Sequence, residues 1–393
     1  MRSRKGGGPA RRTHRLRRRL LVALAVVVVL IPIVGGAGWW YVNHKLGQIH
    51  TIAIQRGLLH GTRPGRPFNV LLIGSDSRQF EKPGSSSSQF GSASAVTGQR
   101  SDVVIIARVV PATKQIYMLS IPRDLYVNIP GKIPYISGMN RINAAFNSGP
   151  SLLIETLKAD FGIGINHFAE INFAGFQSMV DAVGGIHVDF PDQLTDAYSG
   201  LGIYHTGCQL IHGAQSLAFV RSRHLQYKVN GVWTPDYGSD WSRIRRQDIF
   251  FHALLKQVKN EDLNPIAMNN LLGAVVKNIV IDSTMSKSGL LGLAYGFRGT
   301  SPTSIHTEVL PTAPDTLPSG AEVLQSAQPY DAKMVASFLA EGTGHRASGS
   351  RPKAASPTTT ATGNSASTTT TTAPNSSNVV FDKQAEPWNG SAC

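Results

Sequence analysis

The sequence predicts an α/β domain that is displayed outside a membrane on one N-terminal transmembrane helix. Between residues 68 and 342, short apolar runs rich in β-branched residues alternate with helical patterns, which is typical of one packed α/β domain. Before this region, residues 20–42 form an uncharged apolar segment, and after it residues 343–393 form a low-complexity tail that ends in a cysteine.

The N-terminus has the pattern of a membrane anchor. Residues 1–19 contain nine Lys and Arg and no acid, and residues 20–42 contain no charge. At about 1.5 Å per residue, this segment spans the roughly 30 Å hydrocarbon core of a bilayer. The positive-inside rule keeps the basic block in the cytoplasm, and Trp39–Tyr41 suit the outer interface. We therefore expect a single-pass protein of the cell membrane, with a stalk at residues 43–67 and an extracytoplasmic domain.

The basic, apolar N-terminus has two alternative interpretations. The small residues Gly35–Gly38 would suit a cleaved signal peptide, but the apolar run is longer than the roughly 7–15 residues of a signal h-region. Nucleic-acid binding is suggested by the net charge of +14, but nine of these charges lie in the basic block, which leaves +5 for the rest of the chain. Such a surplus favours a local anionic site over a duplex, so no nucleic-acid partner is expected.

Within residues 68–342, apolar runs, caps and breakers predict the elements. Strands are predicted at Phe68–Ile73, Val103–Val110 and Gln115–Ile121. Helices are predicted at Pro150–Phe161, at Phe173–Val183 between the cap Asn172 and the stop Gly184, at Ser242–Lys259 with Ser242 as N-cap, from Pro265 onward, and at Asp331–Ala340. Residues 83–98 have the composition of a flexible loop, and residues 346–378 cannot bury enough apolar surface to fold.

The two cysteines, Cys208 and Cys393, are 185 residues apart, which excludes clustered metal motifs of the CxxC type. In an oxidising compartment they can form a disulfide that ties the end of the chain to the domain. Two free thiols are the alternative.

Asp76 and Asp102 are candidate metal ligands. Asp76 follows the first predicted strand and Asp102 opens the second, and open α/β sheets present ligands at strand ends. Two converging carboxylates suit Mg²⁺ or Mn²⁺. By composition alone, each is equally well explained as a turn or cap residue. Walker, HExxH and GxSxG signatures are absent from the sequence.

Arginines gather at the ends of other predicted elements. Arg123 and Asp124 follow the third strand, and Arg221 and Arg223 follow an apolar run. On the helix predicted from Ser242, three side chains share one face near the positive end of the helix dipole: Arg243, Arg246 and Gln247. Guanidinium forks match pairs of phosphate oxygens, so the set suggests a pyrophosphate clamp. The alternative is a solvated basic helix start.

The order of these motifs resembles the LytR-CpsA-Psr (LCP) family. The resemblance covers about half of the chain, from Phe68 to Lys259, and rests on seven ordered blocks. They are Gly74-Ser75-Asp76-Ser77-Arg78, Ser101-Asp102, Ser120-Ile121-Pro122-Arg123-Asp124, Arg141-Ile142-Asn143-Ala144-Ala145-Phe146, Asn172-Phe173 with Gly175-Phe176, Val180-Asp181-Ala182-Val183-Gly184-Gly185, and Ala218-Phe219-Val220-Arg221-Ser222-Arg223 followed by Asp240, Arg243, Arg246 and Gln247.

The resemblance implies a mixed-sheet α-β-α domain and a Mg²⁺-dependent phosphotransferase, which moves a glycopolymer from a polyprenyl-pyrophosphate carrier to peptidoglycan. By motif, Asp76 and Asp102 hold the metal, and they form the catalytic group with Arg123 and Asp124. The implied pyrophosphate contacts are Arg78, Arg123, Arg141, Arg221, Arg223, Arg243, Arg246 and Gln247. The sequence departs from the family pattern at Arg141, where Lys is frequent, and at Asp248, where a second Gln is frequent. The insert Leu225–Ser239 resembles one found in actinobacterial members and is a candidate for shaping the acceptor site.

Other readings of the same residues remain open at the level of sequence. A hydrolase that cleaves the pyrophosphate with water needs the same donor site. An anchored wall-binding or regulatory protein would use the arginines only to hold an anionic polymer. For the transferase, the general base is a choice between Asp124 and Asp102.

Overall fold

The computed structural model describes residues 36, 38–75, 101–236, 240–260, 265–297, 300–343 and 390–393. The chain divides into two compact units, Met1–Gln48 and Ile49–Cys393. In the first unit, residues 38–46 are helical, the Trp40 ring stacks on His44 at 5.3 Å, and Lys45 Nζ lies 5.7 Å from the centre of the Tyr41 ring. No helix in the described part of the chain is both long enough and apolar enough to cross a membrane. Most of the expected span at residues 20–42 lies outside the described residues, as do the loop at 83–98 and the tail at 346–378.

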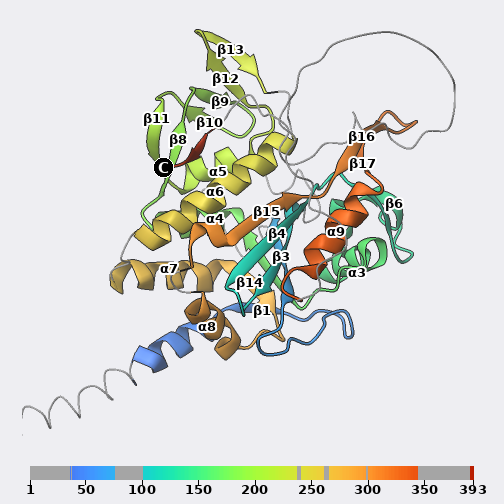
Figure 1. Cartoon of the computed structure of the whole chain (residues 1–393), viewed down its shortest axis with the longest axis vertical. Helices are drawn as coiled ribbons and strands as arrows, with labels where there is room; N and C mark the ends of the chain where they lie inside the picture. The colour runs from blue at the N-terminus through green and yellow to red at the C-terminus, as the bar shows by residue number, and fades with distance from the viewer. Residues whose placement is uncertain are drawn as a thin grey trace, which may run out of the picture. The chain divides into compact units, whose positions relative to one another are not determined.

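The second unit is built on a seven-stranded mixed sheet (Figure 1). In spatial order its strands are β1 (His50–Ile52), β14 (Ile279–Asp282), β7 (His167–Asn172), β2 (Phe68–Ser75), β3 (Ser101–Val110), β4 (Gln115–Ile121) and β15 (Ile305–Val309). The pairs β2–β3, β3–β4 and β7–β14 are antiparallel, and β1–β14, β2–β7 and β4–β15 are parallel. The expectation of a mixed α/β fold is confirmed.

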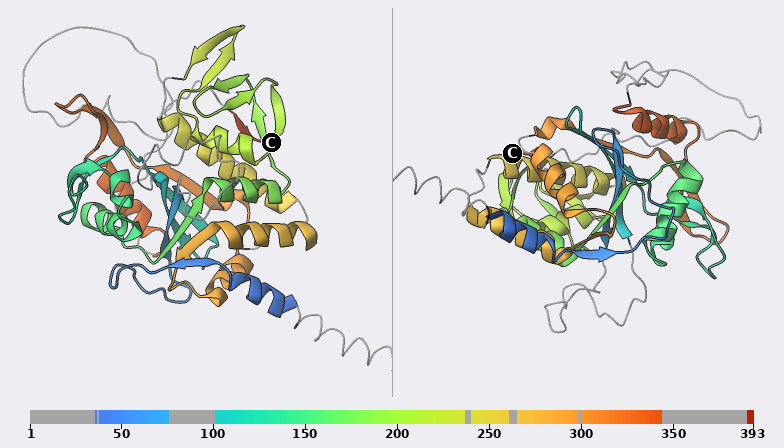
Figure 2. Two further views of the ribbon diagram at one scale, coloured as in Figure 1. Left: turned by 180° about the vertical axis from the view of Figure 1, so that it is seen from behind. Right: turned by 90° about the horizontal axis from the view of Figure 1, so that it is seen from below.

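Helices cover both faces of this sheet, as the edge-on view in Figure 2 shows. They are α2 (Asn143–Phe146), α3 (Pro150–Phe161), α4 (Phe173–Ala182), α5 (Gly213–Arg221), α6 (Asp240–Asn260), α7 (Pro265–Asn278), α8 (Lys287–Gly296) and α9 (Tyr330–Ala340), with a 3₁₀ turn, η2, at Pro302–Ser304. Leu71 and Ile73 of β2 pack with α2, α3 and α9, whereas Val70 on the other face packs with α6 and α8. Because both faces are buried, the central strands are almost continuously apolar.

A second apolar core lies beside the main sheet, where α4, α5 and α6 pack on two small sheets. One has the strand order β11 (Gly207–Ile211), β8 (Ile186–Phe190), β18 (Ser391–Ala392), and the other has the order β10 (Leu201–Ile203), β9 (Leu194–Asp196), β12 (Gln226–Val229), β13 (Val232–Pro235). A disulfide joins Cys208 of β11 to Cys393, with the Cα atoms 5.9 Å apart. The last residues of the chain therefore form an edge strand of this core. Two hairpins complete the domain, β5 (Tyr126–Ile129) with β6 (Gly138–Arg141), and β16 (Thr312–Thr316) with β17 (Glu322–Ser326).

The helix starts show one correct and one wrong prediction. The side chain of Asn172 caps α4 by accepting a hydrogen bond of 2.7 Å from the Gly175 amide, as predicted. The prediction that Ser242 caps α6 is wrong, because this helix already begins at Asp240. The Ser242 hydroxyl instead donates to the carboxylate of Asp236, a tertiary partner that the local sequence does not reveal.

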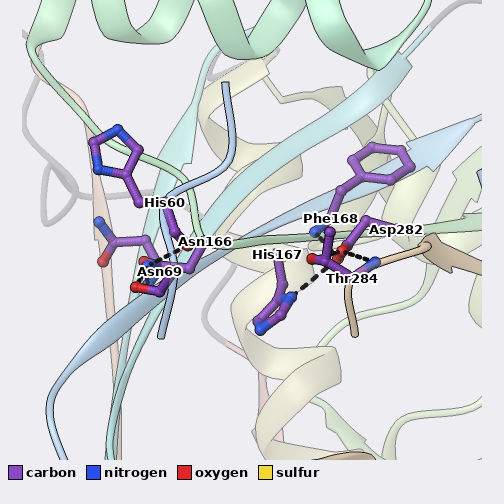
Figure 3. Close-up of polar contacts among 8 residues, drawn as sticks. His60, Asn69, Asn166, His167, Phe168, Asp282 and Thr284 are labelled. Carbon is purple, nitrogen blue, oxygen red and sulfur yellow. Dashed lines mark hydrogen bonds and ion pairs between the residues drawn. The ribbon is translucent and has the colours of Figure 1, made fainter. Parts of the chain in front are cut away.

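The start of β7 is held by two polar side chains, the half-buried Asn166 and the buried Asp282 (Figure 3). Asn166 accepts from the Asn69 amide and donates to the carbonyl of His60, which joins the stalk to the sheet. Asp282 accepts hydrogen bonds from the Phe168 amide at 3.0 Å, from His167 Nδ1 at 3.1 Å and from the amide and hydroxyl of Thr284. Burial acts to raise the pKa of Asp282, but these donors outweigh it and lower the pKa to about 2.

We expect Asp282→Asn to lower the free energy of unfolding near pH 7 by about 2 kcal/mol, since one pKa unit corresponds to about 1.4 kcal/mol. A carboxylate with a lowered folded-state pKa stabilises the protein fully above its unfolded pKa of about 3.8, and this contribution is lost as the pH falls toward 2. Urea denaturation between pH 7 and pH 2.5 should therefore show a flatter profile for the variant.

The matched control is Glu155→Gln, which removes an exposed carboxylate from α3 and should change stability by less than about 0.5 kcal/mol. If Asp282→Asn loses as much stability as the parent protein between pH 4 and pH 2.5, Asp282 does not carry this acid sensitivity.

Candidate functional site

The carboxylate of Asp124 holds three arginines that come from separate parts of the chain. Arg223 donates to Asp124 Oδ2 at 3.0 Å, Arg123 Nε lies 3.5 Å from the same oxygen, and Arg141 Nε lies 3.6 Å from Oδ1. The side chains of Arg123, Arg141 and Arg223 are 22%, 41% and 30% exposed, respectively. Three guanidinium groups around one carboxylate leave excess positive charge within reach of solvent. This cluster can therefore bind a doubly charged anion through several paired hydrogen bonds.

The backbone around Asp124 is fixed by neighbouring strands. Asp124 follows β4, and its carbonyl accepts a hydrogen bond of 3.0 Å from the amide of Leu324 in β17. Arg141, at the end of β6, also donates to the carbonyl of Glu322 at 2.6 Å. Through these two hydrogen bonds, the β16–β17 hairpin holds Asp124 and Arg141 in position.

Arg223 is placed by a second carboxylate, Asp196, at the end of β9. Asp196 Oδ2 accepts from the Ser222 hydroxyl at 2.6 Å and from the amides of Arg223 and His224 at 3.1 Å each, while Oδ1 accepts from the Tyr198 amide at 2.9 Å. Burial acts to raise the pKa of Asp196, but these hydrogen bonds outweigh it and the pKa is lowered. Asp196 is therefore an anionic anchor for the segment that carries Arg223.

Helix α6 supports the same segment from the other side. The buried Arg246 donates to the Ser222 carbonyl and pairs with Asp236 Oδ2 at 3.2 Å. Gln247 donates to the Val220 carbonyl at 3.2 Å. Both residues were predicted to contact pyrophosphate, but the structure places them against the backbone on either side of Arg221. Arg243, from the same predicted set, is also buried.

Arg221 lies at the end of α5, with its guanidinium 4.1 Å from the centre of the Phe173 ring of α4. The two helices approach closely because α5 begins at Gly213, where a Cβ would collide with the backbone of Gln177. The Gly213 amide also donates to Asp181 Oδ1 at 2.8 Å. The contact between α4 and α5 thus sets the position of Arg221.

The predicted metal ligands are only partly covered by the structure. Asp76 and Arg78 lie outside the described residues, and only the backbone of Asp102 is described. The register pairs Ser75 with Ser101 and shifts between Gly74 and Ser75, so the backbone of Asp102 lies beside the end of β2. In the adjacent strand β7, the buried Glu170 accepts a hydrogen bond from the Ser75 hydroxyl, and burial raises its pKa. Among residues whose side chains are described, no group of three or more His, Cys, Asp or Glu is arranged to hold a metal ion.

Sequence reasoning missed Asp196, Asp236 and Glu170. The Asp196 side chain accepts from the amide two residues later, at Tyr198, and aspartate is a frequent first residue of such turns, so the local sequence contains a signal for this contact. Its bond to Ser222, 26 residues away, and the bond of Asp236 to Arg246 depend on tertiary packing.

The fold and the site together define a mixed-sheet α/β domain with a partly exposed cluster of arginines around one carboxylate. The model of the LytR_cpsA_psr family matches residues 45–337. The chain belongs to this family, LytR-CpsA-Psr, which confirms the resemblance seen in the motifs.

Similar proteins include several with roles in the cell wall. The probable cell wall biosynthesis protein LcpB of Corynebacterium glutamicum is 34% identical over 248 residues, which are 62% of this chain and 54% of LcpB. The polyisoprenyl-teichoic acid–peptidoglycan teichoic acid transferase TagU of Enterococcus faecalis is 31% identical over 231 residues, or 58% of this chain and 66% of TagU. The regulatory protein MsrR of Staphylococcus aureus is 27% identical over 216 residues, or 53% of this chain and 59% of MsrR. The chain thus spans between about half and two thirds of these relatives.

Solved structures show the same fold. The LytR-Csp2A-Psr enzyme from Actinomyces oris has a TM-score of 0.57 and 24% identity, and the match covers 74% of this chain and 95% of that one. TagT bound to LI-WTA has a TM-score of 0.52 and 22% identity, with 73% and 98% coverage.

We expect Asp196→Asn to lower the free energy of unfolding by about 1–3 kcal/mol. The carboxylate accepts from the Ser222 hydroxyl and from four backbone amides, and a side-chain amide has only one oxygen to accept these hydrogen bonds. With Arg223 no longer anchored, binding of inorganic pyrophosphate should weaken about tenfold, or by about 1.4 kcal/mol. Urea denaturation and isothermal calorimetry measure the two effects.

Asp192→Asn is the control, since it removes a carboxylate four residues earlier that does not contact residues 222–224 in the described hydrogen bonds. Unchanged pyrophosphate binding in Asp196→Asn would show that Arg223 is held by other groups.

Proposed function

We propose that this protein is a phosphotransferase that attaches a cell-wall glycopolymer, delivered on a polyprenyl-pyrophosphate carrier, to peptidoglycan. The observation that carries the proposal is the cluster of Arg123, Arg141 and Arg223 around Asp124, which is partly exposed and suited to a pyrophosphate. The names of LcpB and TagU support a role in the cell wall. The basic, apolar N-terminus supports an extracytoplasmic domain on a single membrane span, close to a lipid-linked donor.

In the proposed reaction, a hydroxyl oxygen of peptidoglycan attacks the sugar-proximal phosphorus of the donor. A new P–O bond forms, the bond to the bridging oxygen breaks, and polyprenyl phosphate leaves with the electron pair. Phosphoryl transfer depends mainly on positioning and on neutralising charge. We assign these tasks to Arg123, Arg141, Arg221 and Arg223, with Arg78 and Arg243 as further contacts of the donor.

Other site residues hold these arginines in place. Arg246 and Gln247 donate to backbone carbonyls next to Arg221, so we assign them to positioning rather than to phosphate contact. Both oxygens of Asp124 face arginine side chains, so we assign it the same task. Of the two predicted bases, Asp102 then remains the candidate that accepts the proton of the attacking hydroxyl.

Asp76 and Asp102 are the proposed ligands of a Mg²⁺ or Mn²⁺ ion. Carboxylate oxygens suit these hard cations, and the register of β2 and β3 places the backbone of Asp102 beside the residue that precedes Asp76. When bound, such an ion neutralises charge that develops on the phosphate oxygens. Asp102 would accept the proton only if it is not fully committed to the metal ion.

Transfer from a short-chain polyprenyl-pyrophosphoryl saccharide to a peptidoglycan oligomer tests the proposal. With the full chain in detergent and Mg²⁺ present, we expect a phosphosaccharide adduct that disappears with EDTA and in Asp76→Ala. Arg223→Ala should lower kcat/KM about 100-fold, or about 2.7 kcal/mol, because a donor to the developing charge is lost. Arg223→Lys should recover only part of this loss, since an ammonium lacks the guanidinium fork.

Arg56→Ala, which removes an exposed arginine in the stalk, is the control and should transfer normally. Release of polyprenyl phosphate without an adduct would replace the transferase with a hydrolase. Tight binding of the donor without turnover would indicate a non-catalytic wall-binding or regulatory protein.

A further inference from the structure

A cavity of about 640 Å³ lies directly beside the arginine cluster. It is formed by the end of β9 and the following turn, by residues 223–226, and by the end of β13. Arg223 lines this cavity and also contacts Asp124, so one side chain borders both the cavity and the arginine cluster. A ligand whose phosphate binds the arginines can therefore extend its next group into the cavity.

An exposed aromatic pair marks one wall of the cavity. Tyr198 is 84% exposed, and its ring lies 4.5 Å from that of His224 at an angle of 44°. Its backbone is fixed, because the Tyr198 amide donates to Asp196. A tyrosine ring offers a flat apolar face with only two side-chain torsions to order on binding, which is a frequent property of binding surfaces.

The rest of the lining is polar and favours a neutral ligand. Asp196 and Asp236 line the cavity, but their carboxylates are buried and compensated by hydrogen-bond donors and by Arg246, so they present no uncompensated charge to a ligand. Thr195 and the exposed Gln226 add a hydroxyl and an amide, which can donate and accept hydrogen bonds. An apolar face combined with a few hydrogen-bonding groups suits a neutral, hydroxyl-rich ring.

The hairpin of β12 and β13 extends the same surface. Gln226 of β12 pairs with Thr195 of β9, so the hairpin continues the sheet that forms the cavity wall. Trp233 on β13 is 37% exposed, and Lys228 Nζ lies 5.6 Å from the centre of its ring. In Figure 1 the hairpin projects from the domain at the end where β9 and β10 lie.

We propose that this cavity is a saccharide subsite, which holds the sugar next to the reacting phosphate against the ring of Tyr198. The proposal rests on the proposed function, because a phosphate-linked sugar is the group that would follow the pyrophosphate out of the arginine cluster. Two molecules carry such a sugar ring. They are the donor, through its first sugar, and the acceptor, through its glycan strand.

Binding of three probes to the full chain in detergent tests the subsite. They are inorganic pyrophosphate, a short-chain polyprenyl-pyrophosphoryl disaccharide and a peptidoglycan tetrasaccharide. We expect Tyr198→Ala to weaken one of the two saccharide probes about tenfold, because the stacking face is lost, and to leave the Kd of inorganic pyrophosphate unchanged. Weaker binding of the disaccharide alone assigns the cavity to the donor, and weaker binding of the tetrasaccharide alone assigns it to the acceptor.

Two variants serve as controls. Tyr198→Phe keeps the ring and should bind both saccharides as the parent protein does. Tyr204→Ala removes another exposed tyrosine, 59% exposed and outside the cavity lining, and should also leave binding unchanged. The subsite is overturned if the parent protein binds neither saccharide, or if Tyr198→Ala changes neither Kd by more than twofold.

The binding experiment is independent of turnover. If the parent protein transfers the saccharide but Tyr198→Ala behaves normally, the subsite is wrong and the proposed function stands. If no transfer occurs but Tyr198→Ala loses saccharide binding, the subsite stands and the transferase assignment falls.

Discussion

Guanidinium groups repel one another, and the site depends on the carboxylate of Asp124 to hold three of them together. The pairs are partly exposed, and exposed ion pairs contribute only about 0–1 kcal/mol each to stability. The cluster therefore adds little to the free energy of folding. Its value lies in geometry, since it keeps several forked donors in place before a ligand arrives and so reduces the entropy lost on binding.

The stability behind this geometry comes from buried groups. Arg246 and Asp236 form an ion pair whose side chains are 0% and 2% exposed, and removing one partner of such a pair typically costs about 3–5 kcal/mol. Together with Asp196, this pair fixes residues 222–224 through their backbone atoms. A rigid inner layer of polar contacts thus carries an outer layer of partly exposed arginines, and a substitution in the inner layer acts on the ligand only through the outer one.

Local patterns in the sequence predicted much of the fold. The strand Gln115–Ile121 and the helix Pro150–Phe161 have the predicted bounds, because apolar runs, an N-terminal proline and a final glycine are local signals. The Asn172 cap is local for the same reason. The wrong cap at Ser242 shows the limit, since its hydroxyl prefers Asp236, a partner that folding brings close.

The sequence indicates which arginines are candidates for the site, but it does not indicate how they are arranged. The arginines were recognised by motif, but nothing local shows that Asp124 would bind Arg141 and Arg223, or that Arg246 would be buried. Long-range pairing between segments decides which charged residues face solvent and which support them.

The cavity lies beside the arginine cluster because both are anchored by the same buried carboxylate, Asp196. Asp196 anchors the backbone of Arg223 with one oxygen and the turn of Tyr198 with the other, so the partly exposed arginine and the exposed ring share one buried anchor. The acids that line the cavity, Asp196 and Asp236, are buried and compensated by their donors, so the cavity is less charged than the arginine cluster beside it. The buried acid Asp196 therefore supports both Arg223 and the cavity wall. This arrangement suits a ligand that is charged at one end and carries a sugar at the next position.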